Sequence, residues 1–234
     1  MRIALRARRG EMGFTLVELL VAISILAVVL SLSTGLIIRA LDQNSNLTQE
    51  TDAQNRNNTG MEQLTRLLRQ AVFPSGGTNK TSSIITSATA NSITFTTRLA
   101  TATDAASSAF NTPIQQVTAT FNTTTHNLVW GTGAQSASCS GVCTYATPTL
   151  DKTLVYGVRN DGGSTVCPAN TSGNTAVFQY WYTDSTGNLT AWTSALSTEL
   201  ISVVQIRLWT QTQVGPQRPA CVNLTDYVQL RNWQ

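Results

Sequence analysis

One carboxylate stands at the start of a long apolar stretch near the N-terminus, and its position suggests a function. Glu18 is followed by Leu19–Ile38, which contains no charged residue. An acidic side chain surrounded by lipid costs about 2.5 to 3.5 kcal/mol or more when it has no partner, and such residues usually pair with another group. We therefore expect Glu18 to have a cationic partner.

The segment after Glu18 has the length of a membrane span. As an α-helix, Leu19–Ile38 would be about 30 Å long, which is the thickness of bilayer hydrocarbon. The basic residues Arg2, Arg6, Arg8 and Arg9 precede it, and positive charge beside a first helix holds that end on the cytoplasmic side. The pattern predicts a single membrane pass with the remainder of the chain exported.

Three kinds of N-terminal segment fit this pattern. A cleaved secretory signal would use Ser31-Leu32-Ser33 as its cleavage site, but Glu18 interrupts its apolar core and the apolar run continues past that site. A permanent signal anchor fits the length and orientation, but gives Glu18 no purpose. A leader that is cut before the apolar run accounts for both features.

Gly13 followed by Phe14-Thr15-Leu16-Val17-Glu18 resembles the N-terminal motif of type IV pilins and pseudopilins. In that family, a membrane prepilin peptidase cuts after the glycine and methylates the new N-terminal phenylalanine. The resemblance implies cleavage between Gly13 and Phe14, methylation of Phe14, and pairing of Glu18 with the terminal ammonium of a neighbouring subunit. Gly35 stands where many major pilins have proline, which favours a minor component.

The net charge gives no support for nucleic-acid binding. The whole chain has 15 basic and 12 acidic residues, and loss of residues 1–13 would remove four arginines and Glu11, leaving 11 of each. A neutral mature chain lacks the excess positive charge that typically accompanies phosphate-backbone binding. Nucleic acid is therefore an unsupported partner.

The four cysteines all lie in the part of the chain that we expect to be exported, where disulfides form. They are Cys139, Cys143, Cys167 and Cys221. Four cysteines allow three connectivities, of which Cys139–Cys143 with Cys167–Cys221 is the one we favour. A zinc site is disfavoured because there is no Cys-x-x-Cys pair and His126 is the only histidine. We expect neither a metal nor a cofactor.

A second apolar pattern predicts that the N-terminal helix continues beyond the membrane. Apolar residues recur at helical spacing on one face: Met61, Leu64, Leu68 and Ala71. We expect the helix to end near Phe73, before Pro74, although the polar stretch Asn55–Gly60 would be able to break it. The predicted organisation is a leader at residues 1–13, a long helix at 14–73 and an exported domain at 74–234.

The composition after Pro74 predicts β-strands, because threonine, serine and short runs of β-branched or aromatic residues dominate. We expect an α+β fold in which an antiparallel sheet lies beside the long helix. The candidate strands are Ser83–Thr86, Ser92–Arg98, Gln115–Phe121, Leu128–Trp130, Thr153–Arg159, Thr175–Thr183, Val203–Thr212 and Leu224–Arg231. A further resemblance, to the W-type minor pilins and J-type pseudopilins, rests on Val177–Tyr182, the turn Asp184–Gly187, Ile201–Leu208 and Val228–Asn232.

No pattern in the sequence indicates an enzyme. His126 is followed by Asn127 and reads as a turn residue, and Asp161 and Asp184 lie in turn-like sequence where a calcium loop is the alternative. We expect a structural minor pilin that initiates or caps a cell-surface fibre. The alternatives are a periplasmic secretion pseudopilin and an uncleaved surface binding protein. The resemblance implies prepilin peptidase, other pilin subunits and inner-membrane lipid as partners.

Overall fold

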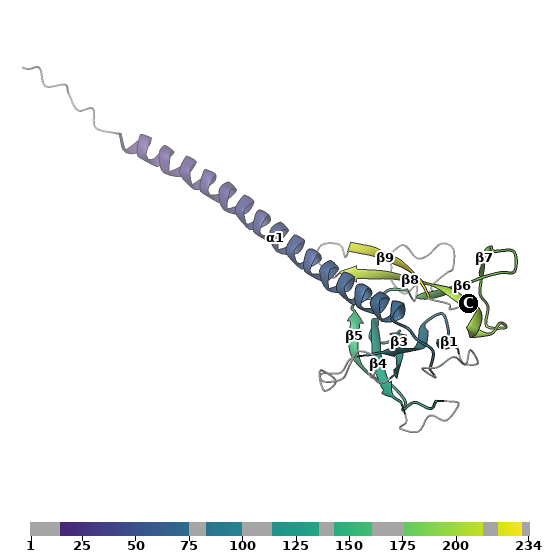
Figure 1. The fold of residues 1–234 in the computed structure, drawn as a ribbon. Coiled ribbons are helices and arrows are strands. Elements are labelled where there is room, and N and C mark those ends of the chain that lie inside the picture. The colour runs from purple at the N-terminus through teal and green to yellow at the C-terminus, as the bar shows by residue number, and fades with distance from the viewer. Residues whose placement is uncertain are drawn as a thin grey trace, which may run out of the picture. The chain divides into compact units, whose positions relative to one another are not determined.

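The structure is a computed structural model that describes residues 15–74, 83–99, 114–135, 143–160, 176–212 and 220–230. The chain divides into two compact units, residues 1–47 and 48–234. Helix α1 (Leu16–Arg69) contributes to both units, and the nine strands found among the described residues belong to the second (Figure 1). The predicted α+β class is confirmed.

In the first unit, α1 is apolar on all sides from Leu19 to Ile38. The leucine, valine and isoleucine side chains from Leu16 to Leu47 are each between 52% and 75% exposed. A helix that is apolar all round needs an apolar environment on every side, as a membrane span does. Its most apolar 18 residues have a mean hydropathy of 2.6, so the helix is long and apolar enough to cross a membrane.

In the second unit, the last turns of α1 pack into the core through one face. Met61, Leu64 and Leu68 are buried as the helical spacing predicts, and Leu67 is buried beside them. The helix ends at Arg69, before the expected Phe73. The reason is that Val72 donates its amide hydrogen to Thr96 O and Ala71 bridges to Thr97, so these residues join a strand instead of continuing the helix.

The helix continues unbroken through Asn55–Gly60, and two residues of this stretch serve as packing contacts. Asn57 is 3% exposed and hydrogen-bonds both backbone groups of Tyr156, at 3.3 Å from its Nδ2 to Tyr156 O and 3.1 Å from Tyr156 N to its Oδ1. Gly60 lies so close to Leu154 that a Cβ there would be 1.8 Å from the Leu154 carbonyl oxygen. Glycine at this position lets the helix approach the neighbouring strand.

The first sheet is a five-stranded antiparallel meander in the order β1-β2-β3-β4-β5. Alternate side chains of its central strands are buried, as Phe95, Val117 and Leu128 show. This is the expected pattern for a sheet with one face on the core. The strands are β1 (Ile85–Ala88), β2 (Ser92–Arg98), β3 (Ile114–Asn122), β4 (Asn127–Ala134) and β5 (Thr149–Val155).

The second sheet has four antiparallel strands in the order β7-β6-β8-β9. A short 3₁₀ helix, Thr198–Leu200, precedes its third strand in sequence. Its strands are β6 (Phe178–Thr183), β7 (Leu189–Ala191), β8 (Ile201–Thr212) and β9 (Ala220–Gln229).

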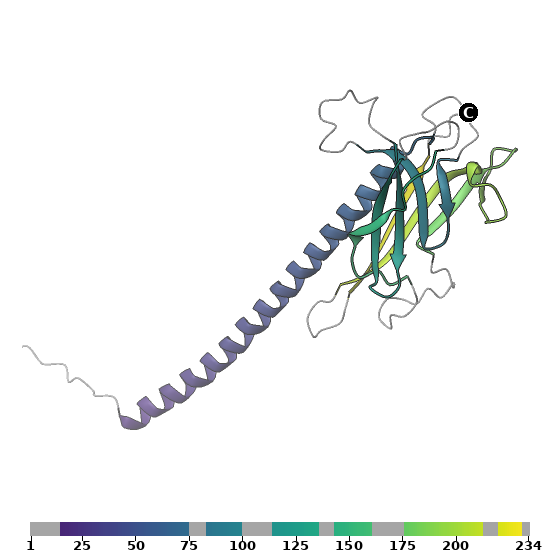
Figure 2. The same cartoon turned by 90° about the horizontal axis from the view of Figure 1, so that it is seen from below.

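We expected one antiparallel sheet, but the strands form two antiparallel sheets that share a core with the end of α1. Leu64 of α1, Phe95 of the first sheet and Ile206 of the second belong to the same buried cluster. Figure 2 shows the strands of the first sheet crossing in front of those of the second. Inward side chains from both sheets and the helix fill the space between the layers.

Candidate functional site

The first turn of α1 holds Glu18 through a reciprocal set of hydrogen bonds with Thr15. The Thr15 backbone N–H and its hydroxyl donate to Glu18 Oε2 at 3.0 and 3.1 Å, and the Glu18 backbone N–H donates to Thr15 Oγ1 at 3.3 Å. Thr15 directly precedes the first helical residue, Leu16. This arrangement is a capping box, in which two backbone donors at a helix start are satisfied at once.

The helix start is also a favourable position for an acidic side chain. The N-terminus of a helix carries partial positive charge, so an acidic side chain in the first turn is stabilised there, by typically 0.3 to about 1 kcal/mol at exposed sites. Glu18 is the acidic residue of that turn. The cationic partner that we predict for Glu18 belongs to a neighbouring subunit, and within the single subunit Thr15 satisfies one of the carboxylate oxygens.

Thr15 is a residue to which the sequence reading gave no separate role. The signal is present in the sequence, since threonine followed three residues later by glutamate, directly before an apolar run, is the sequence signature of a capping box.

The capping pair leaves one carboxylate oxygen of Glu18, Oε1, available for another group. Among the described residues, both of its side-chain hydrogen bonds end on Oε2.

Three hydroxyl groups of the apolar stretch are hydrogen-bonded within the helix. The hydroxyls of Ser24, Ser33 and Thr34 donate to the carbonyl oxygens of Leu20, Val29 and Leu30, each at 2.8 Å. An unsatisfied hydroxyl in lipid would be costly. These bonds reduce the cost of placing the three hydroxyl groups in an apolar environment. Glu18 is the one charged residue between Leu16 and Ile38.

The proposed processing residues, Gly13 and Phe14, lie outside the described residues. So do Cys139 and Cys167, while Cys143 and Cys221 are described and neither is a free thiol. Cys221 lies on β9 opposite Gln211 of β8. The connectivity of the four cysteines stays a prediction.

Of the residues considered for catalysis or calcium binding, His126 and Asp184 lie in turns, and Asp161 lies outside the described residues. His126 has a φ of 56° at the turn between β3 and β4, where Asn122 Oδ1 accepts the backbone N–H groups of Thr124 and Thr125. Asp184 Oδ1 accepts hydrogen bonds from both the amide and hydroxyl of Thr186, and from the amide of Asn188. Within the described ranges, no group of three or more His, Cys, Asp or Glu residues is placed to hold a metal.

Comparison with known proteins agrees with the sequence of the helix start. Residues 8–34 match the prokaryotic N-terminal methylation motif. Among solved structures, the chain is similar to the type IV-like pilin TTHA1219 from Thermus thermophilus, with 9% sequence identity and a TM-score of 0.43, over 75% of this chain and 95% of that one. No curated protein sequence matches. Residues 8–34 therefore carry the prokaryotic N-terminal methylation motif.

Proposed function

We propose that this type IV pilin-like chain is a minor structural subunit of a pilus-like fibre. It is made as a precursor, cut after Gly13 by prepilin peptidase and methylated at Phe14. The observation that carries the proposal is the match of residues 8–34 to the methylation motif, centred on a helix start where Glu18 is held in place. The proposed role of the chain is therefore assembly into the fibre through its N-terminal helix.

The geometry at Glu18 suggests how assembly proceeds. Before assembly the capping box satisfies Oε2, which reduces the cost of keeping the carboxylate beside lipid. Cleavage after Gly13 frees the amino group of Phe14. In the fibre, Oε1 of Glu18 accepts a hydrogen bond from the Phe14 ammonium group of a neighbouring subunit. This charge pair sets the axial register of the two helices.

The apolar surface of α1 then passes from lipid into a helical fibre core. Both surroundings are apolar, so the hydrophobic effect contributes little to this transfer and helix packing with charge pairing decides the outcome. A charge pair in such surroundings contributes chiefly to specificity of register, since desolvation offsets much of its attraction. The same mechanism serves a secretion pseudopilus, and the phenotype of a deletion strain distinguishes the two machines.

The experiment is to replace Glu18 with alanine and to measure where the processed protein goes. We expect Glu18→Ala to be cut normally but to be retained in the membrane fraction and lost from sheared fibres. Asp42→Ala is the matched control, because Asp42 is an exposed acid on the same helix. Incorporation of the Glu18→Ala protein at the level of the control would contradict the pairing role.

A further inference from the structure

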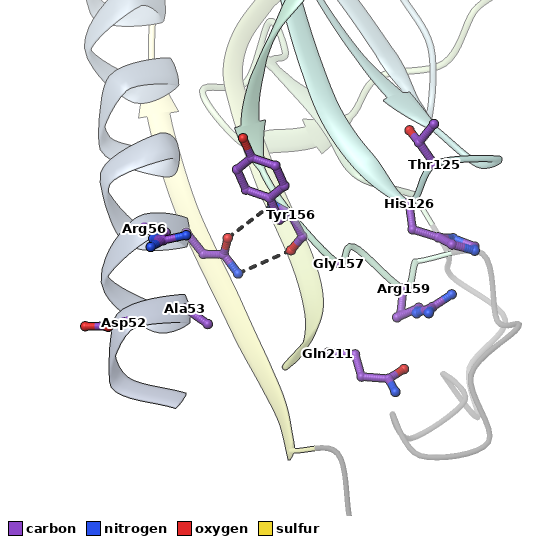
Figure 3. Close-up of a pocket in the computed structure, with 10 residues that line it drawn as sticks. Asp52, Ala53, Arg56, Thr125, His126, Tyr156, Gly157, Arg159 and Gln211 are labelled. Atoms are coloured by element: carbon purple, nitrogen blue, oxygen red, sulfur yellow. Dashed lines mark hydrogen bonds between the residues drawn. The ribbon is translucent and has the colours of Figure 1, made fainter. Parts of the chain in front are cut away.

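A polar pocket of about 480 Å³ lies in the second unit, apart from the helix start that the proposed function uses. Its walls come from α1, from the turn between β3 and β4, from the segment after β5 and from the end of β8. The residues that matter for its chemistry are Asp52, Arg56, His126, Arg159 and Gln211 (Figure 3).

Backbone hydrogen bonds fix the segment that carries Arg159. Its own N–H donates to Trp209 O at 2.6 Å, and the neighbouring Val158 N–H donates to His126 O at 2.6 Å. Gly157 has a φ of +66° and a Cβ there would lie 2.6 Å from Gln211 O, so glycine permits this close approach. The wall is thus positioned before any ligand arrives.

A second anchor fixes the helix side of the pocket. Asn57 hydrogen-bonds both backbone groups of Tyr156. The two dashed lines at Tyr156 in Figure 3 mark these bonds. The amide side chain of Asn160 does the same for β8, donating to Arg207 O at 2.8 Å and accepting from Trp209 N at 2.9 Å. Hydrogen bonds from two asparagine side chains therefore fix the backbone of both walls.

The described residues that line the pocket carry more positive than negative charge. Arg56 and Arg159 line it, and Asp52 is the one carboxylate among its lining residues. In Figure 3 the Asp52 carboxylate points away from Arg159, whereas the side chains of His126, Arg159 and Gln211 extend in the same direction. Among the described residues that line the pocket, the one carboxylate therefore does not face Arg159.

Arg159 carries the strongest evidence for a missing partner. Its Nε is buried and, among the described residues, makes no hydrogen bond. A buried donor without an acceptor costs about 1 to 3 kcal/mol, and more when it belongs to a charged group. Native proteins pair nearly all such donors, so an acceptor from outside the described part of the chain would relieve this cost.

We propose that this pocket binds a small oxyanion ligand, a phosphate or carboxylate group carried by a small molecule, with Arg159 as its principal contact. The guanidinium presents N–H groups in a planar fork that matches the oxygens of these anions. The volume lies within the range of small-molecule sites and exceeds the size of a bare phosphate ion. Arg56, on the helix wall, adds a second positive charge.

The test measures anion binding to the full chain, purified in non-ionic detergent. Sodium phosphate and sodium succinate are titrated at constant ionic strength, and binding is read by calorimetry and by the unfolding temperature, since a ligand that binds only the folded state raises it. We expect saturable binding of at least one anion. Arg159→Gln should weaken it about tenfold or more, because hydrogen bonds to charged groups contribute roughly 1.5 to 3 kcal/mol.

The matched control is Arg66→Gln, which removes the same charge from an exposed position on α1 outside the pocket. Arg56→Gln, at an exposed position inside the pocket, is the second test variant and decides the comparison if Arg159→Gln does not fold. The proposal is overturned if neither anion binds saturably. It is equally overturned if the pocket variants bind as the control does, which would indicate an adventitious ion only.

Discussion

The hydroxyl of Thr15 lies 3.1 Å from Glu18 Oε2, and the Glu18 amide lies 3.3 Å from the same hydroxyl oxygen. The residue that the motif would use for docking is therefore already held by its own chain. Because the bonds converge on Oε2, the carboxylate keeps its position and charge at the helix start while presenting its other oxygen. Glu18 thus has both a structural role within the subunit and a proposed role between subunits.

Removal of the Thr15 hydroxyl should loosen the first turn of α1. Thr15→Val keeps the shape of the side chain but abolishes the two hydrogen bonds of the Thr15 hydroxyl. Loss of such a cap costs about 0.5 to 2 kcal/mol. We expect the Glu18 amide to exchange with deuterium several-fold faster, measured on the full chain in detergent. Ser24→Ala is the control, since its hydroxyl bonds within the helix at Leu20 O. Equal protection of the Glu18 amide in both variants would show that the capping box contributes nothing.

Substitution of Gly13 should block processing without affecting the helix. A large charged side chain in Gly13→Arg would prevent the close backbone approach that glycine allows at a protease subsite. We expect the uncut precursor to accumulate in membranes, detected by its mass. Gly35→Ala should be cut as the natural chain is. Efficient cleavage of Gly13→Arg at its usual place would contradict the assignment of this junction.

Two glycines of α1 should respond in opposite ways to alanine. At Gly60 a Cβ would lie 1.8 Å from Leu154 O, a backbone atom, whereas at Gly35 nothing lies within 4 Å. Gly60→Ala should lower the free energy of unfolding by about 1 to 3 kcal/mol, the typical cost of overpacking a core. Gly35→Ala should be neutral or stabilise the helix by up to about 1 kcal/mol. Thermal unfolding followed by near-ultraviolet circular dichroism measures both, and equal stability of the two variants would refute the close helix–strand contact.

Asp184 should make the stability of the β domain depend on acid pH. The hydroxyl of Thr186, with the amide of Asn188, lowers the pKa of Asp184 below its ordinary value of 3.8. A lowered folded-state pKa stabilises the fold above the ordinary value, and this contribution is lost as the pH falls through the folded pKa. Asp184→Asn should therefore be less stable than the natural chain at pH 7, with the difference shrinking below a pH of about 4.

Urea unfolding at pH 7 and at acid pH measures that difference. The control for Asp184→Asn is Asp151→Asn, which removes an exposed acid from β5. A stability difference for Asp184→Asn that does not change with pH would rule out its carboxylate as the cause.

The sequence predicted local elements well where one periodicity dominated. Ser92–Arg98 was expected as a strand and is β2 with the same bounds, and the buried face of Met61, Leu64 and Leu68 followed from helical spacing. The three-residue strand β7 was not expected, because its pairing with β6, and not its own sequence pattern, defines it.

Long-range contacts were beyond the reach of sequence patterns. Asn57 was read as part of a helix-breaking stretch, but its hydrogen bonds with Tyr156 show that tertiary contact overrides the low helix propensity of asparagine. Likewise Arg56, His126 and Arg159 lie far apart in the sequence and meet only through the sheet topology. The capping pair Thr15 and Glu18, by contrast, is local and was readable from its spacing.

The central claim is that the chain is a processed type IV pilin-like subunit, and its N-terminus tests this most directly. The measurement is mass spectrometry of the N-terminal peptide of the protein taken from its native membrane. The account predicts a chain that begins at Phe14 with a methylated amino group. A mature protein that retains Met1 or Arg2 would contradict it, and would make the apolar part of α1 a simple membrane anchor.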